Sequence, residues 1–432
     1  MSDTVEHVEN QGEEQPKGLK KLLVALLNRP LLIVITVLVL ILVAAYCYNV
    51  NKIPTTAGIT GLDKVVEAPS SGHQLGVVIK LTDGAAGILL AAVPEKLTEA
   101  AGQSPQNPEG YKMRGLNHLQ QGHQDQAMAD FSEALKANPR LADAYNHRGI
   151  VYLNMRQEDK ALADFNQALQ INPASAETRN NRGLVRLDRG EVDQALTDFN
   201  EALKINQANG MVQNNRGLAY LKKADYAQAL ADFSQALKIN PSLRCVFLNS
   251  GIALIGKQDY RQALVELDEA LKAEPDSAWI HYYHGTALLN SGQFEPAIAD
   301  YTDAIKSNHE FSWAYNGRGR AYLGLGEYDL ALADCDQALK IDPDFVWALD
   351  ARGNIFLKKG DTEQAIYNYT QALKINPQFA QARSDRGKAY FQKGDYDQAI
   401  SDLQEALASD SNLPEGLALL DKAISLSTGK LN

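Results

Sequence analysis

A glycine recurs every 34 residues along the C-terminal part of this 432-residue chain. An alanine follows each glycine by twelve residues and a second alanine follows it by nineteen. A period of this length, kept in several columns, indicates a repeat protein whose units bury their apolar faces against each other. The glycines that define the period are Gly115, Gly149, Gly183, Gly217, Gly251, Gly285, Gly319, Gly353 and Gly387.

Each unit is predicted to be a pair of antiparallel helices. In residues 142–175, apolar residues follow helical spacing in two groups, on either side of a polar turn. Small residues in the glycine and alanine columns allow the two helix backbones to approach closely, and large side chains fill the space between them. The large side chains are Phe131, Phe165, Phe199, Phe233 and Tyr301. The second helix is expected to end at Pro139, Pro173, Pro241, Pro275, Pro343 and Pro377.

These columns resemble the tetratricopeptide repeat family over residues 108–413. The resemblance implies an all-α fold, a right-handed α-solenoid of nine 34-residue helix-turn-helix repeats. It also implies a concave groove lined mainly by the first helices. Departures from the family pattern affect a local helix end or a packing detail: Gln207, His309 and Ser411 replace the proline, and Cys335 replaces the large aromatic residue.

Both ends of the repeat array carry sequence typical of a capping helix, which solenoids need to cover their terminal units. Residues 96–107 match the second helix of the first repeat at Glu99, Ala100 and Pro105. Residues 414–432 contain an amphipathic segment. Residues 51–95 are predicted to be a linker.

A single membrane anchor is predicted before the linker. Residues 31–50 read LLIVITVLVLILVAAYCYNV and contain no charged residue. Twenty helical residues span roughly 30 Å, the thickness of the hydrocarbon core of a bilayer, so we expect one transmembrane helix here. Cleavage near Ala44 is the competing interpretation.

Residues 1–30 combine an acidic tail with a basic segment beside the predicted span. The basic residues before the span are Lys17, Lys20, Lys21 and Arg29, whereas only Lys52 and Lys64 follow it closely. The positive-inside rule then places the N-terminus in the cytoplasm and the repeat domain outside it, in the periplasm if the organism is a bacterium.

Two charged columns accompany the glycines. An arginine precedes the glycine in seven repeats: Arg114, Arg148, Arg182, Arg216, Arg318, Arg352 and Arg386. An acid lies fifteen residues after the glycine in eight: Asp130, Asp164, Asp198, Asp232, Glu266, Asp300, Asp334 and Asp402. Ser250 is among the departures in the arginine column, and Asn368 departs from the acid column. The constant spacing favours ion pairs between helices over a ligand-binding row of charges.

Two further columns are candidates for partner binding. Trp279, Trp313 and Trp347 all lie six residues before their glycines, a position that the family resemblance places on the groove. Tryptophan is enriched where partners bind tightly, although packing between repeats also explains the column. Asn181, Asn215 and Asn249 lie two residues before theirs. A row of amides can hold an extended peptide by its backbone, and solvated or turn-bonding asparagines are the alternative.

Other activities find little support. A net charge of −11 without a basic patch argues against nucleic acid. No nucleophile elbow, phosphate-binding loop, metalloprotease or dinucleotide motif is present. Among the histidines only His281 and His284 lie close together, and no acid or cysteine at metal-binding spacing accompanies them. We therefore expect no catalysis, no cofactor and no metal.

The sequence leads to a membrane-anchored scaffold that binds proteins or extended peptides and assembles an envelope complex, held in the lipid bilayer through residues 31–50. The alternative is a non-catalytic regulatory subunit of a single membrane enzyme or of a secretion or import machine. Chaperone-docking members of the family grip a C-terminal carboxylate with a Lys-x-x-x-Asn pair. Here Lys112 is followed by Leu116 instead, which disfavours an import receptor.

Overall fold

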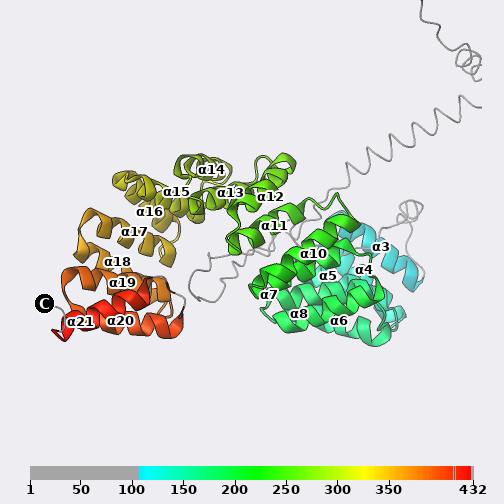
Figure 1. The fold of residues 1–432 in the computed structure, drawn as a ribbon. Coiled ribbons are helices and arrows are strands. Elements are labelled where there is room, and N and C mark those ends of the chain that lie inside the picture. Colours follow the sequence, from blue (N-terminus) through cyan, green and yellow to red (C-terminus); the bar gives the residue numbers. More distant parts are fainter. Residues whose placement is uncertain (1–106, 412, 414, 430–432) are drawn as a thin grey trace, which may run out of the picture. The chain divides into compact units, whose positions relative to one another are not determined.

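The computed structural model describes residues 107–411, 413 and 415–429. Each repeat begins with a helix that carries the repeat glycine (Figure 1). These first helices are α3 (Pro108–Gln120), α5 (Ala142–Asn154), α7 (Ala176–Asp188), α9 (Gly210–Lys222), α11 (Cys245–Gly256), α13 (Ala278–Asn290), α15 (Ser312–Leu325), α17 (Val346–Lys359) and α19 (Ala380–Lys393).

A second helix follows each first helix after a short turn. The second helices are α4 (Gln124–Ala137), α6 (Glu158–Ile171), α8 (Val192–Ile205), α10 (Tyr226–Ile239), α12 (Tyr260–Ala273), α14 (Phe294–Ser307), α16 (Tyr328–Ile341), α18 (Thr362–Ile375) and α20 (Tyr396–Ser409). A last helix, α21 (Gly416–Ser427), packs on α20 within the predicted cap 414–432. The predicted all-helical repeat fold is therefore confirmed for the described part of the chain.

Neighbouring helices pack in a regular order. Each second helix contacts its own first helix and the first helix of the next repeat. First helices of successive repeats also contact each other, as α13 contacts α15 and α15 contacts α17. The first helices therefore form a continuous face, which we call the first-helix face.

The repeat glycines are required by the large side chain sixteen residues later. A Cβ atom added to Gly217 would lie 2.5 Å from Cε1 of Phe233, and one added to Gly149 would lie 2.6 Å from the same atom of Phe165. Both rings are fully buried. The absence of a side chain at the glycine thus lets the ring of the second helix rest directly on the backbone of the first.

The second helices end at the same repeat position with or without proline. Helix α6 ends two residues before Pro173, and α8 ends at the equivalent Ile205 although Gln207 replaces the proline. After α8, the Asn206 side chain accepts a hydrogen bond from the backbone N–H of Ala208 at 3.2 Å. Such asparagine turns recur in most repeats, so the chain leaves the helix without needing proline.

The predicted segments 1–30, 31–50 and 51–95 lie outside the described residues, and so does the predicted cap 96–107 except for Asn107. Asn107 is the N-cap of α3, and its side chain accepts from the backbone N–H of Gly110 at 2.7 Å. Among the helices that the structure does describe, none is long and apolar enough to span a membrane.

Candidate partner-binding face of the first helices

The arginine and acid columns form ion pairs inside the repeats. Arg148 donates from Nε and Nη2 to the two carboxylate oxygens of Asp164 at 2.7 and 2.9 Å. The same two-bond geometry joins Arg114 to Asp130, Arg182 to Asp198, Arg216 to Asp232, Arg318 to Asp334 and Arg386 to Asp402. The interpretation as ion pairs between helices is confirmed.

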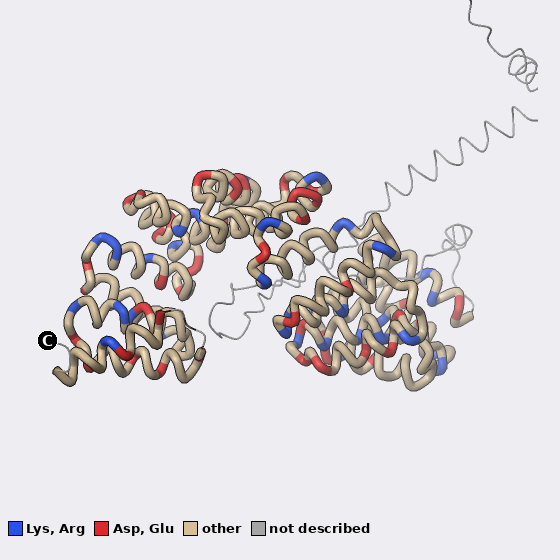
Figure 2. Tube along the Cα trace, viewed as in Figure 1, with Lys and Arg blue, Asp and Glu red and all other residues tan. Residues whose placement is uncertain are grey.

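These pairs also connect neighbouring repeats. Arg182 donates from Nη1 to Asn166 on α6, the second helix of the preceding repeat, at 2.7 Å. Arg216 bonds Asn200 in the same way. The aspartates are buried, so removing one arginine would leave a buried charge without its partner. Figure 2 shows acidic and basic residues interspersed over the repeats, in keeping with charges that pair locally.

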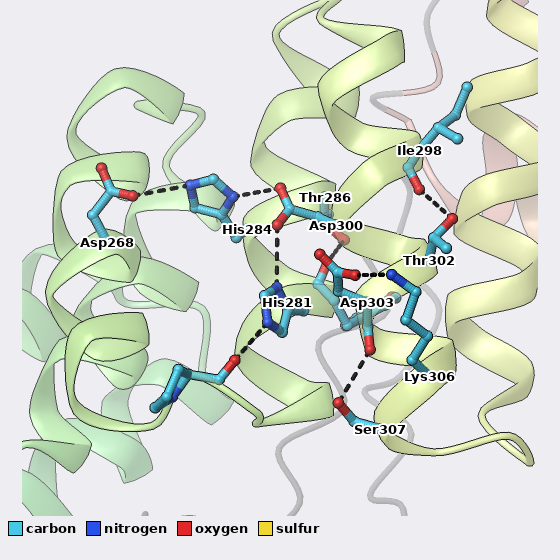
Figure 3. Close-up of polar contacts among 12 residues, drawn as sticks. Asp268, His281, His284, Thr286, Ile298, Asp300, Thr302, Asp303, Lys306 and Ser307 are labelled. Atoms are coloured by element: carbon cyan, nitrogen blue, oxygen red, sulfur yellow. Dashed lines mark hydrogen bonds and ion pairs between the residues drawn. The ribbon is translucent and has the colours of Figure 1, made fainter.

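In the sixth repeat, a histidine cluster takes the place of the arginine pair (Figure 3). Nδ1 of His284 lies 2.6 Å from Oδ2 of Asp300, and Nε2 lies 3.4 Å from Asp268 of the preceding repeat. His281 Nδ1 lies 3.2 Å from the other oxygen of Asp300. Burial lowers the pKa of His284, but its hydrogen bonds and charge contacts with Asp300 and Asp268 outweigh burial and raise the pKa above its ordinary value.

The acid beside this histidine pair comes from the repeat register and not from a metal-binding spacing. Asp300 lies sixteen residues after His284, at the spacing of the arginine–aspartate pairs, and the repeat register therefore contained the signal. In the described residues, no group of three or more His, Cys, Asp or Glu side chains has the geometry to hold a metal ion.

The predicted asparagines belong to a longer row of amides on the first-helix face. Asn249 of α11 donates to Asn214 of α9 at 2.8 Å, and Asn215 donates to Asn180 of α7 at 2.8 Å. Asn181 donates to Asn146 of α5 at 3.2 Å. Within α9 and α7, Asn214 donates to Asn215 and Asn180 donates to Asn181, each at 3.3 Å. The six residues form one continuous chain of hydrogen bonds, which we call the amide ladder.

The amide ladder ends on a carboxylate. Asn146 donates to Oε1 of Glu177 at 2.7 Å. Burial raises the pKa of Glu177 to about 7, although the bond from Asn146 opposes this rise. Every ladder asparagine is at most 3% exposed. Asn181, Asn215 and Asn249 thus lie in the predicted columns, while their binding of a partner stays a prediction.

The three tryptophans form an aromatic row along α13, α15 and α17. Each ring is half-buried and meets, at a steep angle, the ring of the phenylalanine that precedes the next first helix. The centroid distances are 4.6 Å for Trp279 and Phe311, 4.7 Å for Trp313 and Phe345, and 4.5 Å for Trp347 and Phe379. The tryptophans therefore pack against the following repeat. Trp313 and Trp347 also contact a ring of the preceding one, Tyr282 at 6.3 Å and Trp313 at 6.4 Å. Packing between repeats thus accounts for the column, and binding of a partner by the tryptophans stays a prediction.

Two carboxylates extend the ladder columns into the last repeats. Asp350 of α17 and Asp385 of α19 are 35 residues apart, the separation of Asn180 from Asn215. The Asn354 amide donates to Asp350 at 3.1 Å and to Asp385 at 3.5 Å. Burial, followed by the charge of Asp385, raises the pKa of Asp350 well above its ordinary value. We call this pair the acidic rung; sequence reasoning missed it because the two residues fall in different columns.

Comparison with known proteins agrees with the repeat geometry. Family models described as TPR repeat match residues 115–155, 183–224, 353–394 and 387–423. Models described as tetratricopeptide repeat match residues 142–175, 211–243 and 312–345. Together the matched segments span more than half of the chain. No curated protein matches it.

Solved structures that are similar to this chain differ widely from it in sequence. The Cut9–Hcn1 hetero-tetramer of the APC/C is 15% identical, with a TM-score of 0.50, covering 73% of this chain and 76% of that one. A tetratricopeptide repeat protein from Parabacteroides merdae is 20% identical, with a TM-score of 0.47, covering 54% and 93%. Yeast Tom70 is 19% identical, with a TM-score of 0.42, covering 72% and 69%. The helix pairs, their 34-residue period and the matching family models show that this chain belongs to the tetratricopeptide repeat family.

Proposed function

We propose that this protein is a membrane-anchored scaffold that binds an extended segment of partner proteins along its first-helix face. Tetratricopeptide repeat proteins act as protein-interaction scaffolds, and stacked repeats offer extended binding surfaces of this kind. The observation that carries the proposal is the aromatic row of Trp279, Trp313 and Trp347 on three consecutive first helices.

The aromatic row has the properties of a preformed binding surface. Each tryptophan is only half-buried, so part of the ring remains available for contact. The phenylalanine of the next repeat holds the rest of each ring in place. A side chain that is already fixed loses little conformational entropy when a partner binds, and tryptophan is the residue most enriched at energetically dominant contacts.

The anchor and the location are proposed from the sequence. Residues 31–50 would cross the bilayer once, with the N-terminus in the cytoplasm and the repeats on the opposite side. Cell fractionation and protease protection of the full chain test this arrangement. Protease added outside the cytoplasmic membrane should digest the repeats. Repeats that are digested only after this membrane is lysed would lie in the cytoplasm, and the topology would be reversed.

The partner test compares the detergent-solubilised full chain with a variant in which all three tryptophans become alanine. We expect wild-type protein to retain specific envelope proteins in a pull-down and the variant to lose them. Because alanine also removes contacts with phenylalanine, circular dichroism must show that the variant keeps its helical content.

A matched control changes three exposed side chains on the second helices, Val265, Leu330 and Tyr367, to alanine. These residues are 60%, 50% and 56% exposed, so they test whether any loss of apolar surface weakens binding. Partners lost only from the tryptophan variant support the proposal, and partners kept by both variants reject this row as the binding surface. Retention of a single enzyme at fixed stoichiometry would favour a regulatory subunit instead.

A further inference from the structure

We propose that the acidic rung, Asp350 and Asp385, is a subsite for a lysine or arginine side chain of the bound partner segment. The inference rests on the proposed function and deepens it by assigning a chemical class to one position of the partner.

The acidic rung occupies the place of an amide rung. In the amide ladder, residues 35 apart on successive first helices bond directly, as Asn214 and Asn249 do at 2.8 Å. An amide pair can do this because each amide both donates and accepts. Two ionised carboxylates only accept, so Asp350 and Asp385 need a donor between them or a shared proton.

The surrounding side chains supply part of that donor capacity. The Asn354 amide nitrogen lies within 3.5 Å of a carboxylate oxygen of each aspartate. The Tyr369 hydroxyl donates to the Asn354 oxygen at 3.0 Å, which orients the NH2 group toward the carboxylates. Gln381 donates to the same oxygen of Asp385 at 2.9 Å.

One carboxylate oxygen of the acidic rung has no hydrogen-bond donor among the described residues. Asp350 is 8% exposed, and its Oδ1 atom is buried and has no hydrogen-bond partner in the described residues. One repeat earlier in the same column, Asn316 is 5% exposed and its Oδ1 atom is likewise buried without a partner there. Two unpartnered acceptors on neighbouring first helices call for a group that carries only donors, as an ammonium or guanidinium does.

The charge balance points the same way. Within the described residues, neither carboxylate of the acidic rung forms an ion pair, whereas the aspartates of the arginine columns do. Arg320 attracts Asp350 electrostatically, and Lys388 attracts Asp385 in the same way. Lys388, however, already pairs with Glu415 at 3.3 Å. A buried pair of acids without its own cation is complementary to a cation that arrives with the ligand.

An aromatic ring flanks the position. Trp347 lies three residues before Asp350 on α17, so both side chains lie on the same side of that helix. Tryptophan is the best aromatic partner for a cation, with Arg bound more often than Lys. Carboxylates beside a half-buried indole thus suit the head and the methylene stem of a basic side chain.

The test uses the full chain in detergent and a positional-scanning library of fluorescein-labelled decapeptides, read by fluorescence anisotropy. The best-binding sequence is then made with lysine at its preferred basic position and with norleucine in its place. A charge-assisted hydrogen bond predicts about tenfold tighter binding of the lysine peptide.

Asp350→Asn combined with Asp385→Asn converts the acidic rung into an amide rung of the kind the fold already holds. This variant should bind both peptides about equally. Its affinity for the norleucine peptide should equal that of wild-type protein. Asp344→Asn combined with Asp421→Asn replaces two exposed carboxyl groups by amides and should keep the preference for lysine.

Equal binding of the two peptides by wild-type protein would overturn the acidic rung as a basic subsite and leave the proposed function standing. Equal loss of lysine preference in both double variants would also overturn it, because the effect would then be one of overall charge. Failure of every library mixture to bind would reject the peptide-binding function itself, and the subsite with it.

Discussion

Trp313 lies at a steep angle to the ring of Phe345, with centroids 4.7 Å apart, although the two residues belong to successive repeats. Phe345 is the residue before α17 and is 5% exposed. Trp313 is half-buried on α15. The contact therefore ties the start of one first helix to the side of the previous one, and the same arrangement recurs in the repeats on either side.

This relationship predicts energetic coupling between the two rings. In a double-mutant cycle of Trp313→Leu and Phe345→Leu, we expect an interaction free energy of about 0.5–1.5 kcal/mol beyond the loss of buried area. Urea denaturation of the four proteins measures it. Strictly additive effects would show that the rings contribute by burial alone.

The close approach of Gly217 to Phe233 leaves no room for a larger residue at the glycine position. Gly217→Ala should lower the free energy of unfolding by about 1–2 kcal/mol, because overpacking against Phe233 exceeds the gain in helix propensity from alanine. Gly319→Ala is the milder comparison, since Cys335 replaces the ring there. The nearest atom to the new Cβ atom would be the Ala331 backbone oxygen at 3.1 Å, with the Cys335 sulfur at 3.4 Å. Hydrogen exchange of α9–α10 and α15–α16 locates each effect. A larger loss at Gly319 would contradict this explanation.

Glu177, at the end of the amide ladder, should make the stability of the folded protein depend on pH. Its pKa in the folded protein is about 7, above the value of 4.5 for an unperturbed glutamate, so folding favours the neutral acid. This contribution to stability is present below pH 4.5 and is lost as pH rises through 7. Glu177→Gln keeps an oxygen for Asn146 and cannot ionise.

The Glu177→Gln variant should therefore be more stable than wild type at pH 8, by on the order of 2 kcal/mol, and similar to it at pH 4.5. Thermal melts at both values measure the difference. The neighbouring His147 is present in both proteins, so its own titration largely cancels. A difference that does not change with pH would show that the carboxyl group is not the cause.

The sequence predicted the helix pairs because their small residues recur at a fixed spacing. It also predicted the arginine–aspartate pairs, since the same spacing recurs in the six repeats that carry both residues. It did not predict that α8 would end at Ile205 without a proline, because the Asn206 turn that ends it lies in a column that sequence reasoning did not weigh. The regular columns could thus be predicted from the sequence. The asparagine that ends a second helix in place of proline could not.

The candidate site was predicted only by column. Sequence spacing placed Trp347 and Asn215 on first helices, where the structure has them. It gave no sign that Asn215 bonds Asn180, or that Trp347 rests on Phe379, because these contacts join different columns of neighbouring repeats. Such contacts depend on how one repeat is rotated against the next, and a single repeat sequence does not contain that rotation.

His284 predicts a pH dependence that the arginine repeats lack. Its pKa in the folded protein is raised above 6.5, chiefly by Asp300 against the effect of burial, with Asp268 adding to the rise. The stabilisation from the charged imidazole is complete below the unfolded value of 6.5 and is lost as pH rises through the folded value. His284→Arg keeps the charge at every pH in this range and can bond Asp300 as Arg318 bonds Asp334.

We therefore expect the melting temperature of wild-type protein to fall relative to that of His284→Arg as pH rises above 6.5. The reciprocal Arg318→His variant should acquire the same dependence at Asp334. Hydrogen exchange should place the loss of protection in α13 and α14 for wild type and in α15 and α16 for Arg318→His. Parallel pH profiles for wild type and His284→Arg would mean that the imidazole stays in one protonation state, and that its bond to Asp300 does not depend on charge.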